Sequence, residues 1–122
     1  MGAQAQGLEC RGAQKPRQIA ELMFGRKIGD RVGVSEEEWA SFLDREITSR
    51  FPDGLTVLTA AGQWRDRANK EIIREPSRIV QIMLPGDAED LARLNEIAQA
   101  YKAHFQQQFV AIILRPACIS LE

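Results

Sequence analysis

The sequence predicts an α+β domain, because four β-rich segments and two amphipathic helices follow one another in the order β-α-β-β-α-β. Turns that contain glycine or proline separate these segments. That order is the split β-α-β arrangement of the ferredoxin-like fold, in which two helices cover one face of a four-stranded antiparallel sheet. The expected strands span residues 19–28, 55–64, 71–84 and 109–114, and the expected helices begin at Ser35 and Asp87.

The first helix has a clear start and a clear stop. Ser35 can cap its first turn, and Glu38 stands at the position that completes a capping box. Pro52-Asp53-Gly54 ends the helix, and Phe51 just before this turn is expected to fill the core. The apolar face between start and stop is formed at helical spacing by Trp39, Phe42, Leu43 and Ile47.

The second helix is expected to be capped by Asp87, with Asp90 in its first turn. Its apolar stripe consists of Leu91, Leu94, Ile97, Ala98, Tyr101 and Phe105. Tyr101 is expected at the edge of the core, with its hydroxyl group reaching water.

The strands show which of their residues face the helices. In the first strand Leu22 and Phe24 point to one face, and Glu21 and Met23 point to the other. Pro76 interrupts the third strand and predicts a sheet edge or a bulge there, because proline cannot donate a ladder hydrogen bond.

The last strand is apolar on both faces, since Val110, Ile112 and Leu114 alternate with Ala111 and Ile113. The sheet face opposite the helices therefore needs a cover. A second copy of the chain that packs sheet on sheet would supply one, so we expect a homodimer.

Composition fixes the size class and excludes several kinds of protein. The 122 residues correspond to one domain, expected over residues 18–121 after a flexible tail at 1–17. Sixteen basic and 17 acidic residues give a net charge of −1, which argues against a nucleic-acid binder. The apolar runs are far shorter than the about 20 residues of a membrane span.

The two cysteines, Cys10 and Cys118, lie near opposite ends of the chain. This separation argues against a metal site, whose ligands cluster. From the residues alone, both a disulfide that joins the two ends and two free thiols remain open. Residues 1–7 carry no export signal, so the protein is either cytoplasmic or begins after a removed signal peptide.

Six stretches, in their order and spacing, resemble the bacterial family of proteins of unknown function DUF3574. The resemblance covers about residues 10–120. The stretches are ELMFGR (21–26), VSEEEW (34–39), RFPDGLTVL (50–58), GQWRD (62–66), IREPSR (73–78) and RPAC (115–118).

The resemblance implies a location and a crosslink. Members of this family are small exported or lipid-anchored proteins of Gram-negative bacteria, with one cysteine before the first strand and one after the last. It therefore implies a disulfide between Cys10 and Cys118, a removed signal peptide, and a place in the periplasm or cell envelope. No activity is established for the family, so the resemblance implies no mechanism.

The residues give little support for an enzyme. His104 is the single histidine, and its predicted helix face is solvated, so a nucleophile–histidine pair or a haem ligand is hard to assemble. One histidine and two distant cysteines do not form a typical metal site, and no glycine-rich phosphate loop is present. Carboxylate acid–base chemistry stays open, although no pair of acidic residues has a distinctive spacing. We expect no cofactor.

The best candidate site is the hairpin that follows the first helix. Trp64 and Arg65 on one strand are expected to face Glu75 and Ser77 on the next, with Arg26 nearby. Two arginines, a carboxylate, a hydroxyl group and an indole suit a small anionic or planar ligand. Two alternatives stay open: Arg65 and Glu75 form a cross-strand salt bridge with Trp64 packed beneath it, or these residues belong to an interaction surface.

The residues predict a non-enzymatic binding or interaction module that dimerises through its sheet, and the family resemblance implies that it is exported. The alternative is a small enzyme or ligand carrier with an anion-binding pocket around Arg26, Trp64, Arg65 and Glu75.

Overall fold

A computed structural model describes residues 9–28 and 31–122 of the chain. Residues 1–8 of the expected tail and residues 29 and 30 of the expected turn lie outside the described residues. In chain order the elements are β1 (Lys15–Gly25), β2 (Lys27–Ile28), β3 (Arg31–Val32), α1 (Glu36–Phe42), a π-helical stretch (Leu43–Thr48), β4 (Thr56–Arg65), β5 (Ile72–Met83), α2 (Asp90–Phe105) and β6 (Ala111–Ile119).

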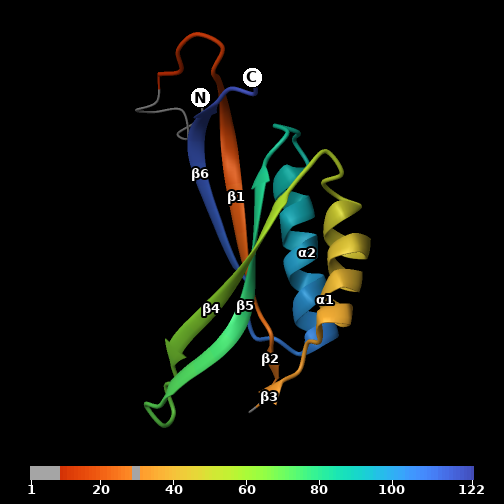
Figure 1. Ribbon diagram of the computed structural model, residues 1–122, viewed down its shortest axis with the longest axis vertical. Helices are drawn as coiled ribbons and strands as arrows, with labels where there is room; N and C mark the ends of the chain where they lie inside the picture. The colour runs from red at the N-terminus through yellow and green to blue at the C-terminus, as the bar shows by residue number, and fades with distance from the viewer. Residues whose placement is uncertain (1–8, 29–30) are drawn as a thin grey trace.

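The main sheet has four strands in the order β4-β5-β1-β6, and every neighbouring pair is antiparallel. Figure 1 shows α1 and α2 side by side on one face of this sheet. The α+β class, the four-stranded antiparallel sheet and the two helices are confirmed. The chain adds a short β2–β3 ribbon and the π-helical stretch, so its element order differs from the predicted one.

Alternation along β1 separates the two faces of the sheet as predicted. Leu22 and Phe24 are fully buried beneath the helices, whereas Met23 is exposed on the other face. On β5, Val80 and Ile82 are buried on the helix side in the same way. We call the opposite side, which carries Met23, the open face of the sheet.

Between sheet and helices lies an aromatic core. Phe24 of β1 contacts Trp39, Phe42 and Tyr101, with ring centroids 4.7–6.1 Å apart. The expectation that the Tyr101 hydroxyl reaches water is wrong. Tyr101 is 0% exposed, because its ring stands between Phe24, Phe42 and Phe105 in the middle of the helix layer.

The two helices begin differently. The Ser35 side chain accepts a hydrogen bond from the Glu38 N–H, and the Glu38 side chain accepts one from the Ser35 N–H, so the predicted capping box is confirmed. The second helix starts at Asp90 rather than at Asp87. Asp87 instead accepts the Glu89 N–H and shapes the turn ahead of the helix.

Pro76 lies inside the sheet rather than on an outer strand, because β5 runs between β4 and β1. It pairs with Ala61 of β4, just beyond the last β1 pair, Gly25–Ser77. Its carbonyl group accepts the Arg26 N–H. Pro76 thus lies where β5 extends beyond the last residue pair with β1. This position explains how the strand continues past a proline without a bulge.

The two ends of the described chain are crosslinked. Cys10 and Cys118 form a disulfide with a Cα–Cα distance of 5.4 Å. The crosslink is favoured by the register, which pairs Pro16 with Cys118 and Lys15 with Ile119. β1 and β6 run side by side (Figure 1), so the segment before β1 and the last residues of β6 lie at the same end of the sheet. Within the described part of the chain, neither helix is long and apolar enough to cross a membrane.

Candidate functional site

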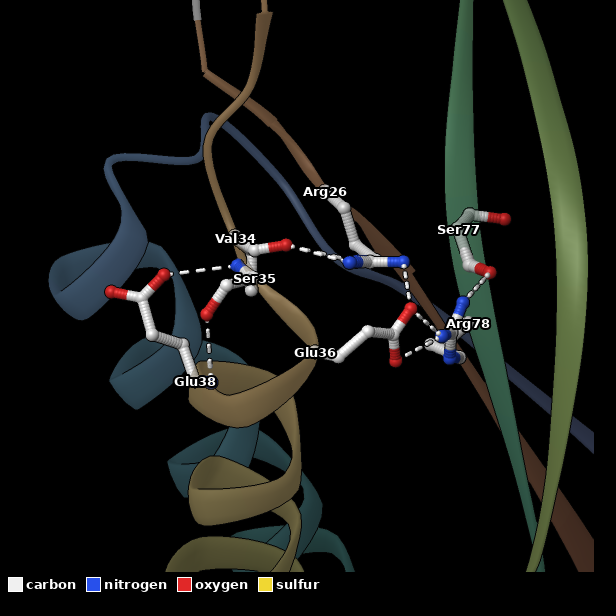
Figure 2. Close-up of polar contacts among 7 residues, drawn as sticks. All are labelled: Arg26, Val34, Ser35, Glu36, Glu38, Ser77 and Arg78. Carbon is white, nitrogen blue, oxygen red and sulfur yellow. Dashed lines mark hydrogen bonds and ion pairs between the residues drawn. The ribbon is translucent and has the colours of Figure 1, made fainter.

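Two buried arginines share one carboxylate where α1 meets the sheet (Figure 2). Arg78 Nη2 lies 2.7 Å from both Glu36 carboxylate oxygens, and Arg26 Nη1 lies 3.0 Å from Glu36 Oε2. Arg26 also donates from Nε and Nη2 to the Val34 carbonyl group, at 3.0 and 2.8 Å. The arginine side chains are 8% and 9% exposed, whereas that of Glu36 is 65% exposed.

Local sequence places these three groups. Arg78 follows the same alternation as Val80 and Ile82, so its side chain enters the helix side of the sheet. Arg26 continues the alternation of β1 beyond Gly25 to the same side. The capping box fixes the first turn of α1 and so positions Glu36, its first residue.

Electrostatics favour the ionised form of Glu36. Hydrogen bonds from Arg78, together with the charges of both arginines, hold the pKa of this carboxyl below its ordinary range. Removing one partner of such an arrangement leaves buried charge uncompensated. The cluster therefore fastens the start of α1 to β1 and β5.

Tyr101 joins the same region from α2. Its hydroxyl group donates to the Gly25 carbonyl group at 2.5 Å. Burial raises the pKa of the Tyr101 hydroxyl, and the charges of Arg26 and Arg78 oppose that rise only in part. Tyr101 is therefore a neutral hydrogen-bond donor that ties α2 to the end of β1.

A second cluster lies on the open face, around Glu75. Trp64 Nε1 donates to Glu75 Oε1 at 3.3 Å, and the Lys27 N–H donates to Glu75 Oε2 at 3.0 Å. A Cβ atom at Gly25 would come within 2.9 Å of Glu75 Oε1. The carboxylate thus occupies the space that a side chain at position 25 would need.

Ser77 lies beside this carboxylate. A Cβ atom at Gly62 would lie 3.8 Å from Glu75 Cγ and 3.9 Å from Ser77 Oγ. The register explains the grouping, because Gly62 pairs with Glu75 and Ser77 pairs with Gly25. The structure thus brings together three of the five predicted site residues: Trp64, Glu75 and Ser77.

The other two predicted residues lie elsewhere. Arg26 is on the helix side, bound to Glu36 and Val34, so the sheet separates its guanidinium group from the Trp64 indole. Arg65 is exposed where β4 ends, opposite Ile72. The cross-strand salt bridge between Arg65 and Glu75 does not form, because neighbours in a strand point to opposite faces and Trp64 takes the face of Glu75.

Sequence reasoning missed Glu36, Arg78 and the inward-facing hydroxyl of Tyr101. A signal for Arg78 was available, since it stands two residues before the buried Val80. Pairing it with Glu36 required knowledge of the tertiary arrangement, because the two residues are 42 positions apart in the chain.

A shallow groove of about 290 Å³ runs between the helices, lined by Phe42, Arg45, Glu46, Ala100, Ala103 and His104. It shares no residue with either cluster. His104 is exposed and stands edge-on to Phe105. Among residues 9–28 and 33–122, no three histidine, cysteine or acidic side chains come together as metal ligands.

Comparisons with known proteins identify a family and a fold. Residues 19–121 match the family described as "Protein of unknown function (DUF3574)". No curated protein matches the chain. Among solved structures, a phage SAM lyase in complex with S-methyl-5'-thioadenosine is similar with a TM-score of 0.65 at 16% identity, over 95% of this chain and 96% of the lyase.

A second solved structure is more distant. CutA from Synechococcus elongatus is similar with a TM-score of 0.53 at 10% identity, over 89% of this chain and 82% of CutA. At such identities both likenesses concern the fold alone.

Proposed function

The chain belongs to the DUF3574 family of proteins of unknown function, and we propose that it is a small, non-enzymatic binding module of the bacterial envelope that works as a homodimer. The two copies meet through the open faces of their sheets. The observation that carries this proposal is the uncovered apolar surface of that face.

The apolar surface is formed by adjacent rows of the sheet. Leu58, Ile79 and Met23 lie opposite one another on β4, β5 and β1, with Met83 and Ile113 in the rows beyond. Met23, Leu58, Met83 and Ile113 are each between 37% and 49% exposed. Contiguous apolar side chains of this kind are typical of interaction surfaces.

The polar groups of the open face favour a second copy as the partner. Glu21 accepts hydrogen bonds from Arg115 at 3.1 Å and from Gln81 at 3.0 Å. Its charge is therefore balanced within the chain, so covering this part of the face does not bury Glu21 as an isolated charge. The partner surface therefore needs the same apolar character, and the open face of a second copy of the chain has it.

Export is proposed from the disulfide. Cys10 and Cys118 are bonded, and structural disulfides persist in oxidising compartments such as the periplasm. The family resemblance points to the same place. We further propose to class the domain as ferredoxin-like, because the antiparallel strand order β4-β5-β1-β6 supports that topology.

A pair of variants tests the dimer. Leu58→Glu places a charge in the middle of the open face, and we expect it to convert the protein to a monomer in size-exclusion chromatography with light scattering. Leu91→Glu is the matched control, because Leu91 is an exposed leucine of α2 on the helix side. Loss of dimer in both variants, or in neither, would contradict an interface on the open face.

The second candidate function is a ligand carrier or small enzyme. The pairing of an exposed indole with a carboxylate, Trp64 with Glu75, favours a ligand site on the open face. The phage SAM lyase of similar fold, which holds S-methyl-5'-thioadenosine, supports the capacity of such a fold to bind a small molecule. Arg26 does not belong to this site, because it lies on the other side of the sheet.

A further inference from the structure

We infer that Trp64 and Glu75 form a binding site for a small organic cation of the methylated-ammonium type. The inference concerns the second candidate function and does not depend on the dimer. It replaces the anionic ligand predicted from the sequence with a ligand of opposite charge.

The charge of the site comes from Glu75. Its carboxylate is half-buried and receives hydrogen bonds from the Trp64 indole and the Lys27 N–H, both of which are uncharged donors. Within the described side chains, no lysine or arginine forms an ion pair with it. Two accepted hydrogen bonds leave lone pairs of the carboxylate available to a ligand.

The recognition surface comes from Trp64. Its indole is 41% exposed, whereas the indole of Trp39 in the core is buried. The hydrogen bond from Nε1 to Glu75 fixes the ring beside the carboxylate. Tryptophan provides the strongest aromatic face for a cation, and a methylated ammonium gains most from such a face because its own hydration is weak.

Neighbouring residues leave room for the ligand. Gly62 carries no side chain beside the carboxylate, and the row between Trp64 and Leu58 contains the small Ala60. Arg65 and Arg74 do not occupy the space, because each stands next in sequence to a residue of the open face and points to the other side. An indole, an unpaired carboxylate and small neighbours on β4, with Ile73 of β5 opposite the indole, together suit a compact cation.

The test is a titration of the oxidised full-length protein with choline, followed through the indole N–H signals in NMR spectra. The protein has two tryptophans, and the buried Trp39 serves as an internal reference. We expect a saturable shift of the Trp64 signal at millimolar choline. The uncharged isostere of choline, with carbon in place of the quaternary nitrogen, is expected to bind about tenfold more weakly.

Variants locate the site. Glu75→Gln keeps a hydrogen-bond acceptor for Trp64 and removes the charge, so choline affinity should fall about tenfold. Glu71→Gln is the control. It removes another carboxylate of the β4–β5 hairpin, one that takes no part in the Trp64–Glu75 hydrogen bond, and should leave choline affinity unchanged. Trp64→Leu should abolish binding while the thermal unfolding transition is retained.

Three results would overturn the inference: no shift of the Trp64 signal, equal binding of choline and its isostere, or unchanged affinity in Glu75→Gln. The first two are measured on the unmodified protein and do not require any variant to fold. The mass of the same sample reports the dimer separately, so failure of the cation site and failure of the dimer are distinguishable.

Discussion

The carboxylate of Glu75 stands directly over Gly25, so close that a Cβ atom there would lie 2.9 Å from Glu75 Oε1. The same carboxylate receives the Trp64 indole N–H from β4 and the Lys27 N–H from the segment after β1. The Glu75 carboxylate of β5 thus connects β4 with the segment that follows β1. The position of Glu75 depends on the absence of a side chain at Gly25.

The first prediction concerns this dependence. Gly25→Ala should push the Glu75 carboxylate aside, weaken its hydrogen bonds and lower the free energy of unfolding by about 1 kcal/mol. The Trp64 indole signal in the NMR spectrum should move as its acceptor is displaced. Choline affinity should fall together with these changes.

Gly62→Ala is the matched control for Gly25→Ala. Its new methyl group would meet its nearest heavy atom, the Glu75 carbonyl oxygen, at 3.7 Å, which is ordinary van der Waals contact. The Trp64 signal should therefore stay close to its original position. Equal displacement of the signal in both glycine variants would show that Glu75 is not held by the space over Gly25.

The second prediction concerns Tyr101, the single tyrosine of the chain. Burial raises the pKa of its hydroxyl, so the folded protein keeps this proton at pH values where the unfolded chain loses it. The stabilising contribution is fully present below about pH 10 and is lost as the pH rises further. Ultraviolet absorbance should show no phenolate in the folded state near pH 10 and its appearance on unfolding.

Removal of the hydroxyl group tests the same contact by mutation. Tyr101→Phe leaves the Gly25 carbonyl group without its donor from α2, and we expect the free energy of unfolding to fall by about 1–2 kcal/mol. Chemical denaturation measures this change. In the unmodified protein, a Tyr101 hydroxyl that titrates at the ordinary tyrosine pKa while the chain is folded would contradict the buried position.

The third prediction concerns Glu36 and acid. Hydrogen bonds from Arg78 lower the pKa of Glu36 in the folded state, so its contribution to stability is present above the unfolded-state pKa and is lost as the pH falls through the folded value. Glu36→Gln should lower the melting temperature at neutral pH. The difference from the unmodified protein should shrink between about pH 5 and pH 3.

Glu37→Gln is the control for Glu36→Gln, because Glu37 is the next residue of the same helical turn and is exposed. It should change the melting temperature little at any of these pH values. If both variants showed the same pH dependence, general helix electrostatics rather than the two arginines would explain the effect of Glu36.

The fourth prediction concerns the disulfide. Cys10 and Cys118 are separated by 108 positions in the sequence, and replacing both with serine should lower the free energy of unfolding by up to about 4–5 kcal/mol. Reducing agent should have the same effect on the unmodified protein and none on the double variant. Equal stability of the oxidised and reduced proteins would contradict a stabilising crosslink.

Local patterns predicted the fold well. Alternation separated Leu22 and Phe24 from Met23, and the Ser35–Glu38 box marked the start of α1. Both signals depend on residues close in sequence. The tertiary environment decided the rest: the hydroxyl of Tyr101 is enclosed because a ring partner from β1 and two from the helices surround it.

The candidate site was predicted only in part, and the reason is strand geometry. Arg26 and Arg65 were grouped with Glu75 because they lie near it along the expected hairpin and strand end. Arg26 directly follows Gly25 and Arg65 directly follows Trp64, and both Gly25 and Trp64 lie on the open face. Because neighbours along a strand point to opposite faces, the two arginine side chains point to the helix side. The placement of Glu75 over Gly25 depends on the β1–β5 register, which no local pattern in the sequence specifies.

The central claim is that the open face of the sheet binds a second copy of the chain. Sedimentation equilibrium of the oxidised, unmodified protein over a range of concentrations tests it most directly. We predict a mass that rises with concentration to twice the chain mass of 13.7 kDa. A mass that stays at that of one chain at every concentration would contradict the claim.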